Sequence, residues 1–209
     1  MNQSPIFGTE GTLISDLIKG CMSPVSRKYG RGDIIMHSGD ENDAIGFVDS
    51  GTVCLVSISL DGQKSIIEYY CENDIFGGVM SPVSDLCGYY LTAKSKCSIT
   101  FVSYAKLIAC CRRCCETHIG LIDRFAASTV RKANVHIDIL GQRSIRGKLV
   151  YFFDMLMKQS GSKHIKLPLS LTDLADYLSV DRSAMMREIK SMNDEGMISS
   201  KGRDVVILK

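Results

Sequence analysis

Short apolar runs alternate with glycine and Asx turn signals between residues 29 and 104, and their period of two is typical of strands. The pattern predicts strands over residues 33–36, 44–49, 52–59, 65–70, 89–93 and 98–103. Many short strands at near-regular spacing predict a small antiparallel barrel or roll. The Asp61-Gly62 pair between two of these runs is typical of a type I′ hairpin turn.

From residue 105 the apolar spacing becomes helical. Positions three and four residues apart form a heptad seam: Ile119, Ile122, Ala126, Thr129, Ala133, His136 and Leu140. Such a seam predicts a long helix that pairs in parallel with the same helix of a second copy. A helix buried within one subunit also needs an apolar stripe, so this alternative stays open. Gly141 follows as a C-cap, and a further helix is expected over 145–159.

Residues 169–190 have the spacing of a helix-turn-helix. The expected inner face of the first helix includes a small residue where the two helices cross: Leu174, Ala175 and Leu178. Ser179 and Val180 form the turn, and Asp181 is positioned to cap the second helix. The second helix has its own inward residues at helical spacing: Met185, Ile189 and Met192.

The outward side of this second helix holds the candidates for contacts with base edges in the major groove: Arg182, Ser183, Met186 and Arg187. Arginine is well suited to bidentate hydrogen bonding with guanine. Two β-prone runs, 197–200 and 205–208, flank a basic, glycine-containing tip and predict a wing. We expect Thr172, Lys201 and Arg203 to contact the phosphate backbone. The alternative is a module that makes only protein contacts, with its arginines as solvated surface charge.

Composition fits a globular protein, with 45% hydrophobic and 23% charged residues. No apolar run approaches the 20 or so residues of a membrane-spanning helix, and the N-terminus lacks a basic region followed by an apolar block. We therefore expect a cytoplasmic protein that makes no membrane contact. Residues 142–209 hold 12 Lys and Arg against 8 Asp and Glu, whereas residues 1–141 hold 13 against 15. This C-terminal excess of positive charge is compatible with phosphate contact.

Six motifs in a fixed order carry a family resemblance: residues 29–35 (YGRGDII), 38–40 (SGD), 48–53 (VDSGTV), 73–77 (NDIFG), 182–189 (RSAMMREI) and 194–198 (DEGMI). In these the chain resembles the Crp/Fnr superfamily, the transcription factors related to the cyclic-AMP receptor protein. The resemblance implies an α+β protein with an N-terminal antiparallel β-roll (1–116), a long dimerisation helix (117–141) and a C-terminal winged helix-turn-helix (142–209). It also implies a homodimer on double-stranded DNA with two-fold symmetric half-sites, and contact with RNA polymerase if the protein is an activator.

The same resemblance implies an effector pocket in the roll: Phe76, Gly77, Gly78, Cys87, Gly88, Ala133 and Asn134. Members that bind cyclic nucleotides carry a Gly-Glu pair for the ribose and an Arg-Ser pair for the cyclic phosphate. This chain has Gly77-Gly78 and Cys87-Gly88 at the matching positions. Without an arginine, a buried phosphate charge would be uncompensated at a cost of several kcal/mol. We therefore expect an effector other than cyclic AMP, or none.

Nine cysteines at irregular spacing fit a reducing compartment better than a disulfide framework. Four of them gather on one predicted helical stretch: Cys110, Cys111, Cys114 and Cys115. Thiolates so spaced could bind a soft metal or form a redox pair, but four ligands on one short helix cannot all converge on a tetrahedral ion. Free cysteines are also ordinary core residues. Neither haem nor an iron–sulfur cluster is supported, because the histidines sit in no haem motif and only Cys21 lies near the N-terminus.

These patterns together predict a sequence-specific DNA-binding transcription regulator. An enzyme built on the roll is not expected, because the chain lacks the histidine-rich metal set of catalytic cupin-like rolls. The competing interpretation is a redox, metal or haem sensor that acts through its cysteines or through protein partners. In that case the winged module would be a protein-contact domain.

Overall fold

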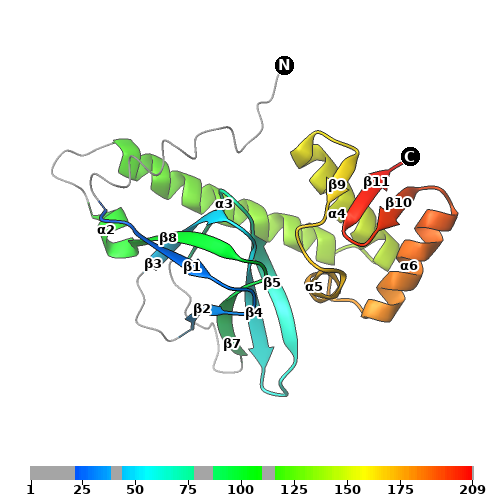
Figure 1. Cartoon of the computed structure of the whole chain (residues 1–209), viewed down its shortest axis with the longest axis horizontal. Coiled ribbons are helices and arrows are strands. Elements are labelled where there is room, and N and C mark those ends of the chain that lie inside the picture. The colour runs from blue at the N-terminus through cyan, green and yellow to red at the C-terminus, as the bar shows by residue number, and fades with distance from the viewer. Residues whose placement is uncertain (1–21, 39–43, 78–86, 110–115, 209) are drawn as a thin grey trace. The chain divides into compact units, whose positions relative to one another are not determined.

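The computed structural model describes residues 22–38, 44–77, 87–109 and 116–208 (Figure 1). Internal contacts divide the chain into two units, residues 1–63 with 67–132 and residues 64–66 with 133–209. Helix α3 (Glu116–Leu140) begins in the first unit and ends in the second.

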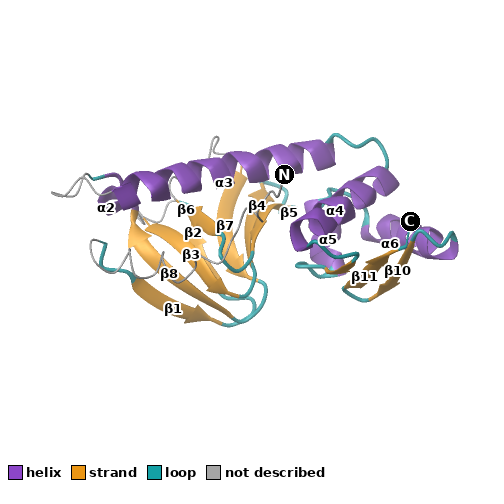
Figure 2. Ribbon diagram, turned by 90° about the horizontal axis from the view of Figure 1, so that it is seen from above, coloured by secondary structure: helices purple, strands orange, loops and turns teal. Residues whose placement is uncertain are grey.

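Strands of the first unit form a roll of two four-stranded antiparallel sheets (Figure 2). The strand order is β1-β8-β3-β6 in one sheet and β2-β7-β4-β5 in the other. The bounds are β1 Val25–Tyr29, β2 Ile34–His37, β3 Ala44–Ser50, β4 Val53–Ser59, β5 Lys64–Tyr70, β6 Ile75–Gly77, β7 Cys87–Ala93 and β8 Cys97–Ser103. A short helix, α2 (Tyr104–Ile108), follows β8.

All six predicted strands are confirmed, with ends within two residues of the prediction. The sequence prediction missed β1 and β6. Strand β1 is exposed along most of its length and therefore lacks the alternation that marks a half-buried strand. Strand β6 has only three residues, too few to show a period.

The interior of the roll is filled by apolar side chains from both sheets: Met36, Val48, Val53, Phe76, Leu91, Ala93, Cys97 and Ile99. Phe76 is only 1% exposed, and its ring packs against Tyr70 and edge-on against Phe101. The Phe76 ring also requires a glycine opposite it, because a Cβ built on Gly46 would lie 2.3 Å from the Phe76 Cζ atom. Gly46 is thus a packing residue of β3.

A second apolar cluster holds α3 and α2 against the roll: Met22, Ile45, Phe47, Ile75, Val102, Leu107 and Leu121. Strand β3 contributes to both clusters, since Ile45 and Phe47 belong to this one and Val48 to the interior. Burial on both faces is characteristic of a central strand rather than an edge strand. Figure 2 shows α3 lying across the strands of the roll.

The hairpin turn at Asp61-Gly62 is not of the predicted type I′. Type I′ requires positive φ at both central residues, and within this loop only Gly62 has one, at 81°. The Ser59 amide donates to the Gln63 carbonyl (3.0 Å) and the Gly62 amide to the Ser59 carbonyl (2.9 Å), so the loop has three residues. The Asp61 carboxylate accepts from the Ser59 hydroxyl, which lowers the pKa of Asp61.

Helix α3 exposes one apolar stripe along its length. Six of the seven predicted seam residues are exposed, whereas His136 is half-buried. Val130 and Ile137 are 59% and 65% exposed and complete the stripe: Ile119, Ile122, Ala126, Val130, Ala133, Ile137 and Leu140. Within the described residues, no helix combines the length and apolarity that a bilayer span requires.

The second unit contains α4 (Ile145–Ser160), α5 (Leu171–Tyr177), α6 (Arg182–Asp194) and a sheet of order β10-β11-β9. The strands are β9 His164–Lys166, β10 Ile198–Lys201 and β11 Asp204–Ile207. The predicted helix over 145–159 is confirmed: Ser144 caps it by accepting from the Gly147 amide at 3.0 Å, and left-handed Gly161 ends it. Strand β9 was missed in the sequence prediction because, like β6, it has only three residues.

Replacement of Gly46 by alanine should destabilise the roll by about 1 to 3 kcal/mol, because the added methyl group overpacks against Phe76. Urea unfolding followed by circular dichroism measures this. Gly88 in β7 is the matched control, since within the described part of the chain a Cβ there meets no atom within 4 Å. Equal stability of the Gly46→Ala and Gly88→Ala variants would contradict the packing role of Gly46.

Candidate nucleic-acid interface

Helices α5 and α6 each begin at a capping side chain. The Ser170 hydroxyl accepts from the Asp173 amide (3.1 Å) at the start of α5. The Asp181 carboxylate accepts from the Ala184 amide (2.8 Å) at the start of α6. Each cap satisfies a backbone donor that the helix itself leaves unpaired. The predicted capping role of Asp181 is therefore confirmed.

The turn between the two helices brings them into close contact. Ser179 has a left-handed φ of 51°, which is uncommon for a residue with a side chain. The Val180 amide then donates to the Ala175 carbonyl at 3.0 Å. Ala175 is 1% exposed, so its small side chain lies on the inner face of α5 as predicted. The predicted inward residues of α6 are buried: Met185, Ile189 and Met192.

Exposed hydrogen-bond donors occupy the side of α6 that faces away from this core. Arg182, Ser183 and Arg187 are all exposed. Lys190 is also exposed and lies three residues beyond Arg187, on a neighbouring part of the same face. The sequence prediction did not include Lys190, although the helical spacing from Arg187 was sufficient to find it.

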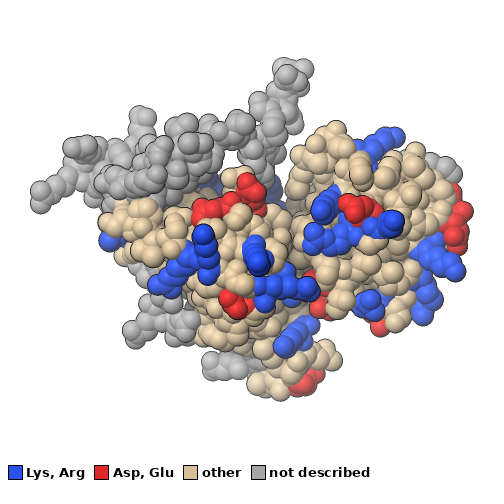
Figure 3. All heavy atoms as spheres, in the orientation of Figure 1, with Lys and Arg blue, Asp and Glu red and all other residues tan. Residues whose placement is uncertain are grey.

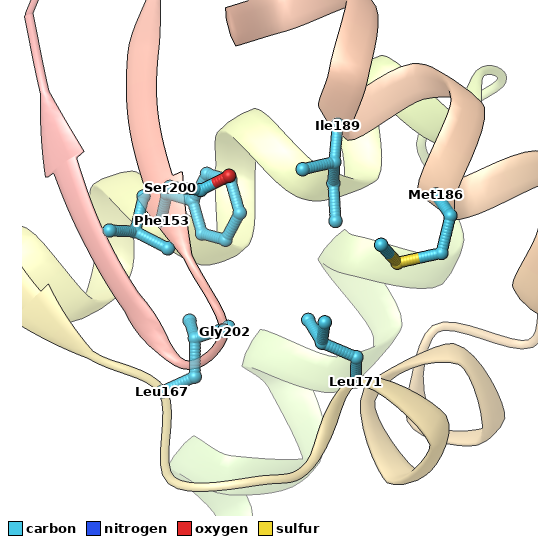
Figure 4. A pocket seen from close by; sticks show the side chains of 8 residues that line it. Phe153, Leu167, Leu171, Met186, Ile189, Ser200 and Gly202 are labelled. Carbon is cyan, nitrogen blue, oxygen red and sulfur yellow. The ribbon is translucent and has the colours of Figure 1, made fainter.

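Met186 does not share this exposed position. Figure 4 shows its side chain turned toward the hollow that also receives Leu171 and Ile189. The hollow is lined mainly by apolar groups of the unit's core: Phe153, Leu167, Leu171, Met186, Ile189, Ser200, Gly202 and Val205. Met186 is half-buried, so we interpret it as a packing residue beneath α6 and not as a residue that faces bases.

Strands β10 and β11 form the predicted hairpin, with Lys201 paired with Asp204 at its end. Gly202 at the tip has a φ of 62°, a conformation that favours glycine. Lys201 and Arg203 are exposed at this tip, and Thr172 is exposed in the first turn of α5. These residues are the three predicted backbone contacts, and all of them are accessible.

Strand β9 adds a basic residue beside the wing. Lys166 and Lys201 are both cross-strand neighbours of Asp204, one on either side, so the three side chains share one exposed row of the sheet. The Leu167 amide donates to the Arg203 carbonyl at 2.8 Å, which extends the ladder to the wing tip. The sequence prediction did not include Lys166, because a strand of three residues shows no period in the sequence.

Arg146 in α4 binds two acidic side chains, Glu188 on α6 and Glu195 at its C-terminal end. Its guanidinium donates to both carboxylate oxygens of Glu195 (2.6 and 2.8 Å) and to Glu188. It also contacts the Ser191 hydroxyl at 3.2 Å. Hydrogen bonds from Glu195 and Glu188 raise the pKa of Arg146 further above its usual range. The ion pairs fix the C-terminal half of α6 to α4 and offset two negative charges.

Figure 3 shows Lys and Arg side chains spread over the surface of this unit, with Asp and Glu among them. Because the two signs of charge are mixed, attraction of an anionic ligand such as DNA depends on which Lys and Arg side chains lie near one another. Lys166 and Lys201 flank Asp204 in one row of the sheet, Arg203 is exposed at the wing tip, and Arg182 and Arg187 are exposed on α6.

The end of α3 is attached to α5 through His136. The imidazole stacks on the Tyr177 ring with 4.1 Å between centroids, and its Nε2 lies 2.8 Å from the Tyr177 carbonyl oxygen. His136 thus packs within its own chain, and the exposed stripe of α3 passes through Ile137 instead.

Phe76 and Gly77, both predicted to line an effector pocket, have packing roles in the roll. Phe76 fills the interior. Gly77 has a φ of 109°, and a Cβ there would lie 2.4 Å from the Ala44 carbonyl oxygen. The roll requires both residues whatever the effector.

The remaining predicted pocket residues stay a prediction. Gly78 lies outside the described residues, and the side chain of Cys87 is likewise undescribed. Gly88 is an exposed position of β7. Ala133 and Asn134 are exposed on the part of α3 that belongs to the second unit.

The described cysteines have the character of core residues. Burial raises the pKa of Cys71 to about 11 and also raises the pKa of Cys97. A raised pKa keeps a thiol protonated and therefore unreactive. Within the described ranges, no group of three or more His, Cys, Asp and Glu residues is arranged to hold a metal ion. The predicted weak metal candidates lie outside these ranges: Cys110, Cys111, Cys114 and Cys115.

Two family models match the chain in the order of its units. Residues 26–114 match the cyclic nucleotide-binding domain, and residues 147–209 match the Crp-like helix-turn-helix domain. The first match covers the strands of the roll, and the second covers α5, α6 and the wing. The two models thus identify the same architecture as the structure.

Relatives and solved structures agree with these matches. The chain is 20% identical to the cAMP-activated global transcriptional regulator CRP of Pasteurella multocida, over 86% of this chain and 88% of that protein. It is 21% identical to the nitrogen fixation regulation protein FixK of Rhizobium meliloti, over 87% and 82%. The fold is similar to FixK2 of Bradyrhizobium japonicum, with a TM-score of 0.71 and 20% identity over 89% of this chain and 93% of that one. The chain belongs to the Crp/Fnr family of DNA-binding transcription regulators.

Proposed function

We propose that this chain acts as a homodimer that reads a two-fold symmetric site on double-stranded DNA. The observation that carries the proposal is the exposure of Arg182, Ser183 and Arg187 on one side of a capped α6, beside a basic wing. Arginine side chains near the start of a recognition helix can reach base edges in the major groove. We also propose that the protein acts in the cytoplasm. If it activates transcription, RNA polymerase would be a partner.

The contacts divide into two kinds. Arg182 and Arg187 would read bases, with Ser183 assisting them. Backbone phosphates would be contacted by exposed residues of α5, α6 and the sheet: Thr172, Lys190, Lys166, Lys201 and Arg203. Phosphate contacts position the protein, and base contacts specify the sequence. The Arg146 ion pairs support this surface because they offset the charge of Glu188 and Glu195.

The exposed stripe of α3 is the proposed dimer seam. Its apolar residues recur three and four positions apart, which is the spacing of a parallel coiled coil. The proposed seam therefore differs from the predicted one at two positions. It contains Val130 in place of the neighbouring Thr129 and Ile137 in place of the neighbouring His136. A two-fold axis along this seam would give the two recognition helices the symmetry of a palindromic site.

We propose that the effector is not a cyclic nucleotide, or that there is none. The chain lacks the arginine that would compensate a cyclic phosphate, and Phe76 and Gly77 are already required by packing. Burial raises the pKa of Cys71 and Cys97, so these two described thiols do not favour a redox role. The cysteines on which the redox alternative rests lie outside the described residues: Cys110, Cys111, Cys114 and Cys115. No enzymatic activity is part of the proposal.

Replacement of Arg187 by alanine should weaken binding to the specific site by about 1 to 3 kcal/mol and relax sequence preference there, because one bidentate base contact is lost. Met186→Ala on the same helix is the matched control. It should lower the melting temperature of the winged unit and leave the ratio of specific to non-specific affinity unchanged, because Met186 packs inward. Fluorescence anisotropy with specific and scrambled duplexes measures both. A larger loss of preference in Met186→Ala than in Arg187→Ala would contradict the proposed division of roles.

Replacement of both Val130 and Ile137 by aspartate should dissociate the dimer, since a buried Ile side chain alone contributes about 1.5 to 3 kcal/mol. We expect the dimer dissociation constant to rise roughly a hundredfold or more. Sedimentation velocity measures the change. Leu60→Asp is the control, because Leu60 is 79% exposed in a turn of the roll. A dimer that survives the double substitution would exclude this seam.

Cyclic AMP should leave the melting temperature of the protein unchanged at concentrations up to about a millimolar, because a ligand raises the melting temperature only when it binds the folded state. Differential scanning fluorimetry is the measurement. Saturable stabilisation by cyclic AMP in the micromolar range would contradict the predicted loss of nucleotide binding.

A further inference from the structure

The hollow beneath α6 lies inside the winged unit, between α6 and the wing (Figure 4). Its volume is about 120 Å³. Three of the side chains that line it, Phe153 of α4, Ile189 of α6 and Val205 of β11, are buried. Met186 and Ser200 are half-buried, and Gly202 is exposed at the wing tip. The hollow therefore reaches the surface beside the wing tip, and all of its lining residues belong to one unit.

The size and lining of the hollow define the kind of molecule that fits it. Seven of the eight described residues that line it carry no nitrogen or oxygen in their side chains. A buried water molecule needs roughly two to four polar partners, so this lining favours an apolar occupant over water. A dry cavity of about 150 Å³ lined by Leu, Ile and Phe side chains can bind benzene or xenon. Pockets for drug-sized ligands are larger, about 300 to 1,000 Å³. The occupant is therefore limited to a molecule with one small ring.

Ser200 supplies the one polar side chain among the described residues that line the hollow. Its Oγ atom accepts from the Asn193 Nδ2 atom at 2.8 Å, and its backbone amide donates to the Asn193 Oδ1 atom at 2.8 Å. Asn193 also donates to the Ile189 carbonyl at 2.7 Å, so Ser200 is fixed relative to α6. A hydroxyl has one donor in addition to its acceptor sites. Ser200 can therefore accept from Asn193 and donate to a ligand at the same time.

We propose that this hollow is a binding site for a compact ligand with one apolar ring and one hydrogen-bond acceptor. The apolar side chains enclose the ring, and the Ser200 hydroxyl donates to the acceptor. The site lies in the winged unit, whereas the sequence predicted an effector pocket in the roll. An occupant contacts α6 through Met186 and Ile189 and the wing through Gly202 and Val205. Binding at this site does not require the proposed DNA-binding function.

The test uses phenol and toluene, two probes of similar shape of which only phenol carries a hydrogen-bond acceptor. Each probe is titrated, without DNA, into the full chain with isotope-labelled methionine methyl groups, and NMR spectra are recorded. The methyl signal of Met186 should shift and then saturate as either probe fills the hollow. The signal of Met36, which is buried in the interior of the roll, is the internal control and should stay in place.

Two variants separate the polar and apolar parts of the site. Ser200→Ala should weaken phenol binding about fivefold, the scale of one lost neutral hydrogen bond, and leave toluene binding at the wild-type level. Leu171→Phe should abolish binding of both probes, because Leu171 points into the hollow and the larger ring occupies it. Leu208→Phe is the matched control and should bind both probes like the wild type, since Leu208 is 49% exposed in the same unit and does not line the hollow.

The proposal is overturned if neither probe produces a saturable shift of the Met186 signal at about 10 mM, where even a weak ligand of so few atoms is detected. Probe binding that Leu171→Phe leaves unchanged would also overturn it, because the probes would then lie elsewhere. Equal weakening of phenol and toluene binding in Ser200→Ala would contradict the polar contact. If Leu171→Phe fails to fold, the phenol and toluene comparison in Ser200→Ala decides. Failure of the wild-type chain to select any operator would instead contradict the proposed function.

Discussion

Helix α3 must satisfy two sets of packing partners at once, and this constraint organises the rest of the molecule. Leu121 joins the apolar cluster formed with β3 and α2, and Ile139 is fully buried in the second unit. Lys132 and His136 supply the polar contacts in between. Since these groups leave the apolar stripe of α3 exposed, the same helix can also bury that stripe against a second copy.

Packing accounts for the motif residues of the roll without reference to a ligand. Phe76, Gly77 and Gly46 are fixed by contacts with one another and with neighbouring strands, so their presence reports the fold and says little about a ligand. A phosphate ligand needs compensating charge, and no packing constraint maintains that charge when the ligand is no longer used. The described ion pair between Lys132 of α3 and Asp74 of the roll holds α3 against the roll.

Elements with a strong period or a specific turn were predictable from the sequence, such as the six alternating strands, the helix over 145–159 and the Asp181 cap. The short strands β6 and β9 were not, because three residues cannot show a period. Met186 was assigned to the outward face of α6 and His136 to the dimer seam, because spacing alone does not say which way a side chain turns at the edge of a stripe. The ion pair between Lys132 and Asp74 joins residues about 60 positions apart, and only the tertiary fold brings them together.

The most direct test of the account is selection of binding sites by the full chain from a pool of randomised DNA duplexes, followed by sequencing. The enriched sequences should form an inverted repeat whose two halves are centred about one helical turn, roughly 10 base pairs, apart. Its measured affinity should fall steeply with salt concentration, because each phosphate contact releases counterions. Recovery of no enriched sequence, together with binding that is insensitive to salt, would contradict it.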